Sequence, residues 1–164
     1  MSTAGPPQGA PVPPAGPPQG ARYRSGAPAG CFTWPVRVYW EDTDAGGIVF
    51  YANYLKFFER ARTEWLRSLG IEQQALREAT GGMFVVSETR ARYHLPARLD
   101  EQLLVTAWPL EIGRASLTIG QQANRGPEAG GSLLCEASIR IGWVLGADLR
   151  PARIPADILR ALQP

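Results

Sequence analysis

Alternation of apolar and polar positions begins near Trp34 and marks the start of a folded region. Val36, Val38 and Trp40 recur at every second position, with more polar residues between them. A period of two is typical of a strand that is buried on one face. The pattern therefore predicts a first strand in this segment.

A different period follows between Asn53 and Gly70. Apolar residues recur there three and four positions apart: Tyr54, Phe57, Phe58, Ala61, Trp65 and Leu69. This spacing predicts an amphipathic helix with an aromatic buried face. Asn53 suits its N-cap and Gly70 its C′ position. The remaining charged residues predict a solvated outer face with pairs three and four apart: Glu59, Arg60, Arg62, Glu64 and Arg67.

Strand patterns dominate the rest of the chain. A short helix is expected over residues 72–79, ended by two glycines. Strands are expected over residues 84–93, 102–111, 115–123 and 132–145, and a brief helix in the closing PADILRAL segment. The short connections between these strands predict antiparallel neighbours.

This order of elements predicts an α+β fold. A long aromatic helix needs an apolar surface to cover it, and a five-stranded antiparallel sheet wrapped around the helix supplies one. Such a sheet leaves an edge strand exposed. Pairing of edges between two copies hides that edge, so we expect a homo-oligomer.

The N-terminal segment, residues 1–30, differs in composition from the rest of the chain. It contains 8 Pro, 6 Gly and 6 Ala, and the hexapeptide GPPQGA occurs twice. This composition buries too little apolar surface to offset its chain entropy. We therefore predict a disordered tail over residues 1–30 and one domain over residues 31–164, with the tail dispensable for folding.

Charge and side-chain chemistry exclude several classes of function. Arg22 and Arg24 in the tail account for the net charge of +2, so the balanced domain argues against nucleic acid as a partner. Cys31 and Cys135 have no metal-ligand spacing and are expected to be free thiols. A single histidine argues against a zinc site. No membrane span or signal sequence is expected, which predicts a cytoplasmic protein.

The segment VRVYWEDTDAGGIVFYANYLKFFERAR, residues 36–62, carries the most specific pattern. A strand leads into D-x-D, then a Gly-Gly pair, then an aromatic helix. This order resembles the 4-hydroxybenzoyl-CoA thioesterase and YbgC-like families of hotdog proteins, including the thioesterase associated with the Tol-Pal system. The segments RARYHLPARLDEQLLV and RPARIPADILRAL extend the resemblance over the predicted domain, and only the tail falls outside it.

The resemblance implies a hotdog fold and hydrolysis of acyl-CoA thioesters without a cofactor. It assigns Asp44 as the catalytic carboxylate, acting as nucleophile or general base. A carboxylate is ionised at neutral pH and needs no histidine to activate it. The resemblance also places a backbone N–H that polarises the thioester carbonyl near Tyr51, where a helix start offers free N–H groups. Gly46 and Gly47 would let substrate approach the backbone closely.

Other residues are given lesser or structural roles. Asp42 is expected to be structural, and His94 to be structural or on the surface. Arg114 is a candidate contact for coenzyme A phosphates, because guanidinium pairs well with phosphate. Many YbgC-like proteins have His at the position of Tyr51 and Tyr at that of Trp40, so substrate preference and any auxiliary acid or base stay open.

Two alternatives also stay open. The first is a thioesterase that acts on acyl-carrier-protein with the same carboxylate. The second is a non-catalytic hotdog scaffold for cell-envelope or lipid-synthesis partners. The sequence does not decide acyl chain length, aromatic or aliphatic preference, or dimer versus tetramer.

Overall fold

The computed structural model describes residues 26–127 and 130–163. Its strands are β1 (Phe32–Arg37), β2 (Gly82–Tyr93), β3 (Gln102–Ile112), β4 (Ser116–Arg125), β5 (Leu133–Leu145) and the short β6 (Arg150–Pro151). Its α-helices are α1 (Asn53–Ser68), α2 (Gln73–Thr80) and α3 (Ala156–Leu162), and one 3₁₀ turn, η1, covers Trp40–Asp42. The four later strands and three helices predicted from the sequence are confirmed, with small shifts at their ends.

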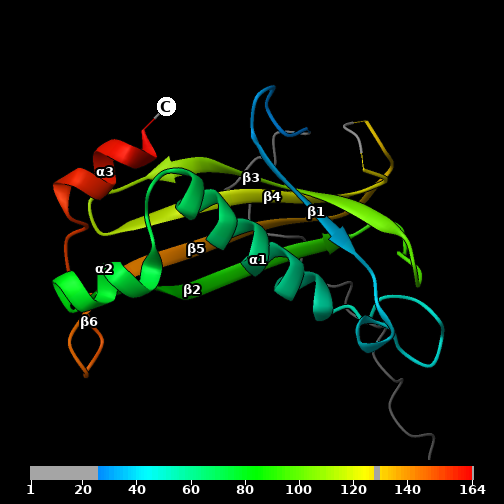
Figure 1. The fold of residues 1–164 in the computed structure, drawn as a ribbon, viewed down its shortest axis with the longest axis horizontal. Coiled ribbons are helices and arrows are strands. Elements are labelled where there is room, and N and C mark those ends of the chain that lie inside the picture. The colour runs from blue at the N-terminus through cyan, green and yellow to red at the C-terminus, as the bar shows by residue number, and fades with distance from the viewer. Residues whose placement is uncertain (1–25, 128–129, 164) are drawn as a thin grey trace, which may run out of the picture.

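The strands form one antiparallel sheet in the order β1-β3-β4-β5-β2, and β6 pairs with the end of β5. Helix α1 lies across one face of this sheet, as Figure 1 shows. The predicted α+β hotdog arrangement, a curved sheet around one long helix, is confirmed. In the described part of the chain, β1 and β2 are the two edge strands.

The aromatic face of α1 supplies the centre of the core. Phe57, Phe58 and Ala61 are fully buried, and Tyr54 and Trp65 nearly so. They pack in one cluster with side chains from the facing strands, such as those of Val105, Ile119 and Ile139. Each buried large side chain contributes about 1.5–3 kcal/mol. The aromatic period in the sequence therefore identified the element that the sheet encloses.

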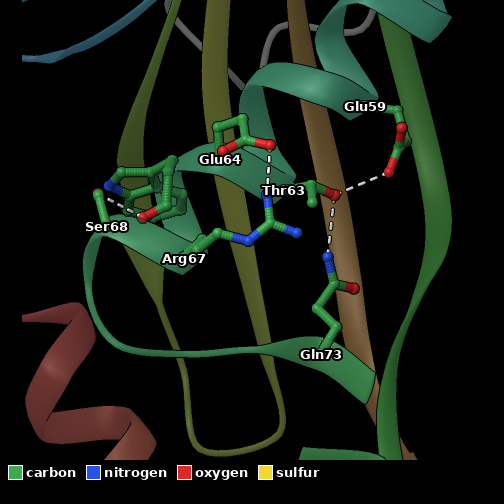
Figure 2. A network of polar contacts seen from close by, with 7 residues as sticks. Glu59, Thr63, Glu64, Arg67, Ser68 and Gln73 are labelled. Carbon is green, nitrogen blue, oxygen red and sulfur yellow. Dashed lines mark hydrogen bonds and ion pairs between the residues drawn. The ribbon is translucent and has the colours of Figure 1, made fainter. Parts of the chain in front are cut away.

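The outer face of α1 carries polar contacts, shown in Figure 2. Thr63 Oγ1 donates to Glu59 Oε1 at 2.8 Å and accepts from Gln73 Nε2 at 2.9 Å, which links α1 to α2. Arg67 pairs with Glu64, as the sequence predicted. These exposed contacts are individually worth little.

Arg62 was wrongly assigned to this solvated face. It is half-buried, and its Nη1 donates to Oε1 of Gln121, a fully buried residue of β4, at 2.9 Å. The Gln121 amide in turn donates to the Phe58 carbonyl at 2.9 Å. A charge pattern alone did not reveal this contact because the glutamine is distant in sequence.

The first strand is shorter than its alternation predicted. Val36 and Val38 are buried as expected, but β1 ends at Arg37 and Trp40 is 79% exposed. Trp40 begins a 3₁₀ turn in which its carbonyl accepts the Thr43 N–H at 3.2 Å. The apolar residue at position 40 therefore continued the period of two without continuing the strand.

The predicted boundary lies between a tail over residues 1–30 and a domain over residues 31–164. The structure bears on this boundary only through residues 26–30. Residues 1–25 lie outside the described residues. Within the described part, Ala27 N–H donates to Gln122 Oε1 of β4 at 3.3 Å, and Cys31 N–H donates to the Pro28 carbonyl at 3.2 Å. The segment just before residue 31 thus contacts the sheet.

Two truncations test where the domain begins. Removal of residues 1–25 is expected to leave the melting temperature unchanged. Removal of residues 1–30 also deletes the Ala27–Gln122 hydrogen bond, which costs about 1 kcal/mol and a few degrees. Thermal unfolding of both truncated proteins beside the full chain measures the difference. A large fall in melting temperature after removal of residues 1–25 alone would contradict a dispensable tail.

Candidate functional site

Asp44 lies in a tight turn between η1 and α1. Thr43 and Val49 form an isolated antiparallel bridge, and inside it Asp44 N–H donates to the Ile48 carbonyl at 2.9 Å. Gly47 N–H donates back to the Asp44 carbonyl at 3.0 Å. The Asp44 side chain is exposed, and its Oδ1 accepts the Gly46 N–H at 2.8 Å. The turn therefore presents a carboxylate to solvent in a defined orientation.

The two glycines serve this turn in different ways. Gly47 has φ = +72°, a left-handed conformation that a side chain disfavours. A Cβ on Gly46 would lie 3.0 Å from Asp44 Oδ1. Gly47 thus permits the turn, and Gly46 leaves room for the carboxylate.

Asp42 has the opposite environment although it lies only two positions before Asp44. It is 2% exposed, and its Oδ2 accepts the Tyr39 N–H at 2.9 Å. Its carbonyl oxygen accepts the Phe50 N–H at 2.9 Å and Asn53 Nδ2 at 2.9 Å. These bonds tie η1 to the start of α1, which supports the structural interpretation of Asp42.

The start of α1 differs from the prediction in one respect. Ala52, not Asn53, is the N-cap residue, and no side chain caps the helix. The Asn53 side chain reaches the Asp42 carbonyl instead, so it is unavailable as a cap. Among the described residues, the Tyr51 N–H donates to no backbone carbonyl. This N–H therefore lies without a backbone acceptor at the positive end of the helix dipole.

An apolar groove of ≈ 260 Å³ adjoins the Tyr51 segment. Its walls come from the Asp44 turn (Ile48, Val49), the helix start (Tyr51, Tyr54) and the end of β2 (Tyr93). The Tyr93 ring packs edge-on against Tyr51, with centroids 6.3 Å apart, and against Tyr54 at 5.7 Å. Sequence spacing gave no signal for Tyr93, which is far from Tyr51 along the chain.

Arg114 does not lie near Asp44 within the same chain. It lies in the turn between β3 and β4, where its carbonyl accepts the Ile154 N–H at 2.8 Å. Asp44 follows β1, whose last residue pairs with the first residue of β3. Since β3 has 11 residues, Arg114 is about 35 Å along the strand from that end.

His94 also lines the apolar groove, and its ring has a partner on β5. Its Nε2 lies 3.1 Å from Oε1 of Glu136, a buried residue of β5 that also pairs with Arg92. This contact supports the structural interpretation of His94. Arg90 pairs with Glu88 on β2 at 2.6 Å.

The cysteines do not supply a nucleophile. Both are free thiols, as predicted. Burial raises the pKa of the Cys135 thiol to about 12, and burial also raises the pKa of Cys31. A thiol with a raised pKa holds little of the reactive thiolate at neutral pH. Within the described residues, no three His, Cys, Asp or Glu side chains are arranged to hold a metal ion.

The model of the thioesterase superfamily matches residues 46–131, more than half of the chain. This chain belongs to the thioesterase superfamily. This superfamily member is 39% identical to the acyl-CoA thioesterase YbgC of Haemophilus influenzae, over 79% of its own length and 93% of that protein. It is 42% identical to the acyl-CoA thioester hydrolase YbgC of Escherichia coli, over 78% of its own length and 92% of that protein.

The fold is also shared with solved thioesterases. A 1,4-dihydroxy-2-naphthoyl-CoA thioesterase from Synechocystis superposes with a TM-score of 0.73, at 20% identity, over 81% of this chain and 96% of that chain. No described helix of this superfamily member is both long and apolar enough to cross a membrane.

Two alanine substitutions test how the turn holds Asp44. Gly46→Ala is expected to push the carboxylate aside by a few tenths of an ångström, with a loss of thioester turnover on the order of tenfold. Gly47→Ala is expected to cost about 1 kcal/mol of stability, because its φ is positive. Turnover and urea unfolding of both variants provide the comparison. Normal turnover in Gly46→Ala would contradict the role given to the turn.

Proposed function

We propose that this thioesterase hydrolyses acyl-CoA thioesters with Asp44 as its catalytic carboxylate. The observation that carries the proposal is the exposed Asp44 carboxylate, held by the Gly46 N–H in the turn that leads into α1, whose start no side chain caps. Relatives of 39% and 42% identity, named acyl-CoA thioesterase and acyl-CoA thioester hydrolase, support the choice of coenzyme A as the carrier.

The chemistry requires an anionic oxygen near the thioester carbonyl. Asp44 either attacks the carbonyl carbon directly, giving an acyl-enzyme anhydride that water then hydrolyses, or removes a proton from the attacking water. In both routes a carbon–oxygen bond forms, the carbon–sulfur bond breaks, and coenzyme A leaves as a thiolate that takes up a proton. Among the described residues, Asp44 has no salt-bridge partner that would neutralise its charge.

The Tyr51 N–H supplies the complementary group. As the carbonyl oxygen becomes negative, a fixed N–H donor at a helix start stabilises it without any reorganisation. The Tyr51 side chain is 63% exposed, so its role in this proposal comes from its backbone rather than its phenol. Gly46 and Gly47 add no side chains beside Asp44, which leaves the thioester room to approach.

Arg114 remains the proposed contact for a coenzyme A phosphate. Because it lies at the far end of β3 from Asp44, this role favours a coenzyme bound at the Asp44 site of a neighbouring subunit. The homo-oligomer predicted from the exposed sheet edge, a dimer or tetramer, would provide such a neighbour. Location in the cytoplasm also remains a prediction.

Neither alternative function gains a specific observation. No feature of the described residues favours an acyl-carrier-protein over coenzyme A. A purely non-catalytic scaffold has no need of the carboxylate that the Asp44 turn presents.

Assembly is tested by light scattering at micromolar concentration, where at least twice the chain mass of 17.8 kDa is expected. Val86 is 53% exposed on edge strand β2. Val86→Lys should weaken an interface formed by that edge, because edge charges oppose strand pairing. Leu110→Lys, at an exposed position of β3 that β4 and β5 separate from β2, is the matched control. A monomer with full turnover would contradict a site that needs two subunits.

The catalytic assignment is tested by Asp44→Asn. The amide keeps an oxygen for the Gly46 N–H but is a poor nucleophile and a poor base, so turnover should fall by at least about 10²-fold. Affinity for an unreactive acyl-CoA analogue should stay the same or improve. The measurements are release of free coenzyme A with a thiol reagent, and calorimetric binding.

Asp42→Asn is the matched control, since it makes the same chemical change two positions away. Its amide oxygen still accepts the Tyr39 N–H, so we expect a much milder loss of turnover. Circular dichroism confirms folding of both variants. A folded Asp44→Asn protein with near-normal turnover would contradict the catalytic role of Asp44.

A further inference from the structure

One hydrogen bond connects the end of edge strand β2 to the start of α1. The Tyr93 hydroxyl donates to the Tyr51 carbonyl oxygen at 3.1 Å. The two rings also pack edge-to-face, with centroids 6.3 Å apart. A strand end and a helix start that are distant in sequence are thereby joined at the residue whose N–H the proposed function uses.

The peptide before Tyr51 is already fixed by backbone contacts. Phe50 N–H donates to the Asp42 carbonyl at 2.9 Å, and the Phe50 carbonyl accepts the Asn53 N–H at 2.8 Å. The Asn53 bond holds the peptide plane that contains the Phe50 carbonyl and the Tyr51 N–H, and the Asp42 bond holds the plane before it.

The peptide after Tyr51 depends on a side chain. Its carbonyl accepts the Tyr93 hydroxyl, and no backbone donor among the non-helical contacts of the described residues reaches it. The φ and ψ angles of Tyr51 connect the two peptide planes. Loss of this bond therefore leaves the plane after Tyr51 free to rotate, and residue 51 is then held from one side only.

We propose that Tyr93 is a positioning residue for thioester hydrolysis, acting through its hydroxyl on the Tyr51 backbone. It keeps the Tyr51 N–H directed at the place where the thioester oxygen becomes negative. This inference rests on the proposed function, and it adds a residue that acts through the Tyr51 backbone.

The phenol keeps its proton over the working range of pH. Burial, and to a lesser extent the nearby Cys135 and Tyr51, raises the pKa of Tyr93 above its usual value. A raised pKa means that the neutral donor form persists to higher pH. The hydrogen bond to Tyr51 is therefore present throughout neutral and mildly basic conditions.

Tyr93→Phe tests the proposal, since it removes the hydroxyl and keeps the ring. We expect kcat to fall about tenfold with KM nearly unchanged, a smaller loss than the roughly 10²–10³-fold typical of deleting an oxyanion donor outright. The melting temperature should change little, because Tyr93 is 45% exposed.

Two tyrosine variants separate positioning from packing. Tyr39→Phe removes a hydroxyl from a 58% exposed residue and should leave kcat and stability unchanged. Tyr54→Phe leaves the buried Ala97 N–H without its acceptor, which lies at 3.0 Å, and should lower the melting temperature. A merely structural role for Tyr93 predicts the stability loss of Tyr54→Phe rather than a selective loss of kcat.

A spectroscopic measurement keeps this test independent of the proposed function. In protein labelled with ¹⁵N-tyrosine, the Tyr51 amide signal should shift and its relaxation should report greater motion in Tyr93→Phe, but not in Tyr39→Phe. An unchanged Tyr51 amide, or a kcat within twofold of the parent, would overturn the positioning role. Full turnover in Asp44→Asn would instead count against the proposed function and leave the amide result standing.

Discussion

The carbonyl oxygen of Asp42 accepts two hydrogen bonds, one from the Phe50 N–H and one from the Asn53 side chain. Burial of the aromatic face of α1 fixes the helix against the sheet, and these two bonds fix its start against η1, the turn that follows β1. The Asp44 turn is the chain between the two anchored points. Its position relative to the helix start is therefore set by the core rather than by the turn alone.

This arrangement gives two neighbouring aspartates different chemistry. Asp42 has its carboxylate satisfied by the Tyr39 N–H and shielded from solvent. Asp44 accepts one backbone N–H and remains exposed. A buried, hydrogen-bonded carboxylate stabilises the fold, because replacing its contacts leaves backbone donors unsatisfied. An exposed carboxylate without an ion-pair partner among the described residues is free to meet a substrate.

Edge strand β2 connects the site to the question of assembly. Its last residue, Tyr93, contacts the start of α1, while its outer edge has no partner strand in the described part of the chain. A second copy that pairs with this edge would lie close to the same tyrosine. In the proposed oligomer, the stability of the Tyr51 segment and the pairing of this edge would be coupled through one strand.

The sequence by itself predicted most of the elements and singled out one candidate carboxylate. Periods of two and of three to four report which face is buried, so the later strands and α1 with its aromatic face were predictable from local pattern. The family resemblance carried by the order of strand, D-x-D, Gly-Gly and helix made Asp44 the candidate. The same reasoning failed at Trp40, where a local 3₁₀ turn ended the strand, and at Arg62, where a long-range contact with Gln121 decided the environment.

Only the tertiary structure decided which distant groups meet. Tyr93 with Tyr51, Asn53 with the Asp42 carbonyl, and Arg62 with Gln121 are contacts across 42, 11 and 59 positions. It also separated Arg114 from Asp44 by the length of β3. Hydrogen bonds of this kind depend on sheet register and helix placement, which are properties of the whole packed core, so no local spacing in the chain encodes them.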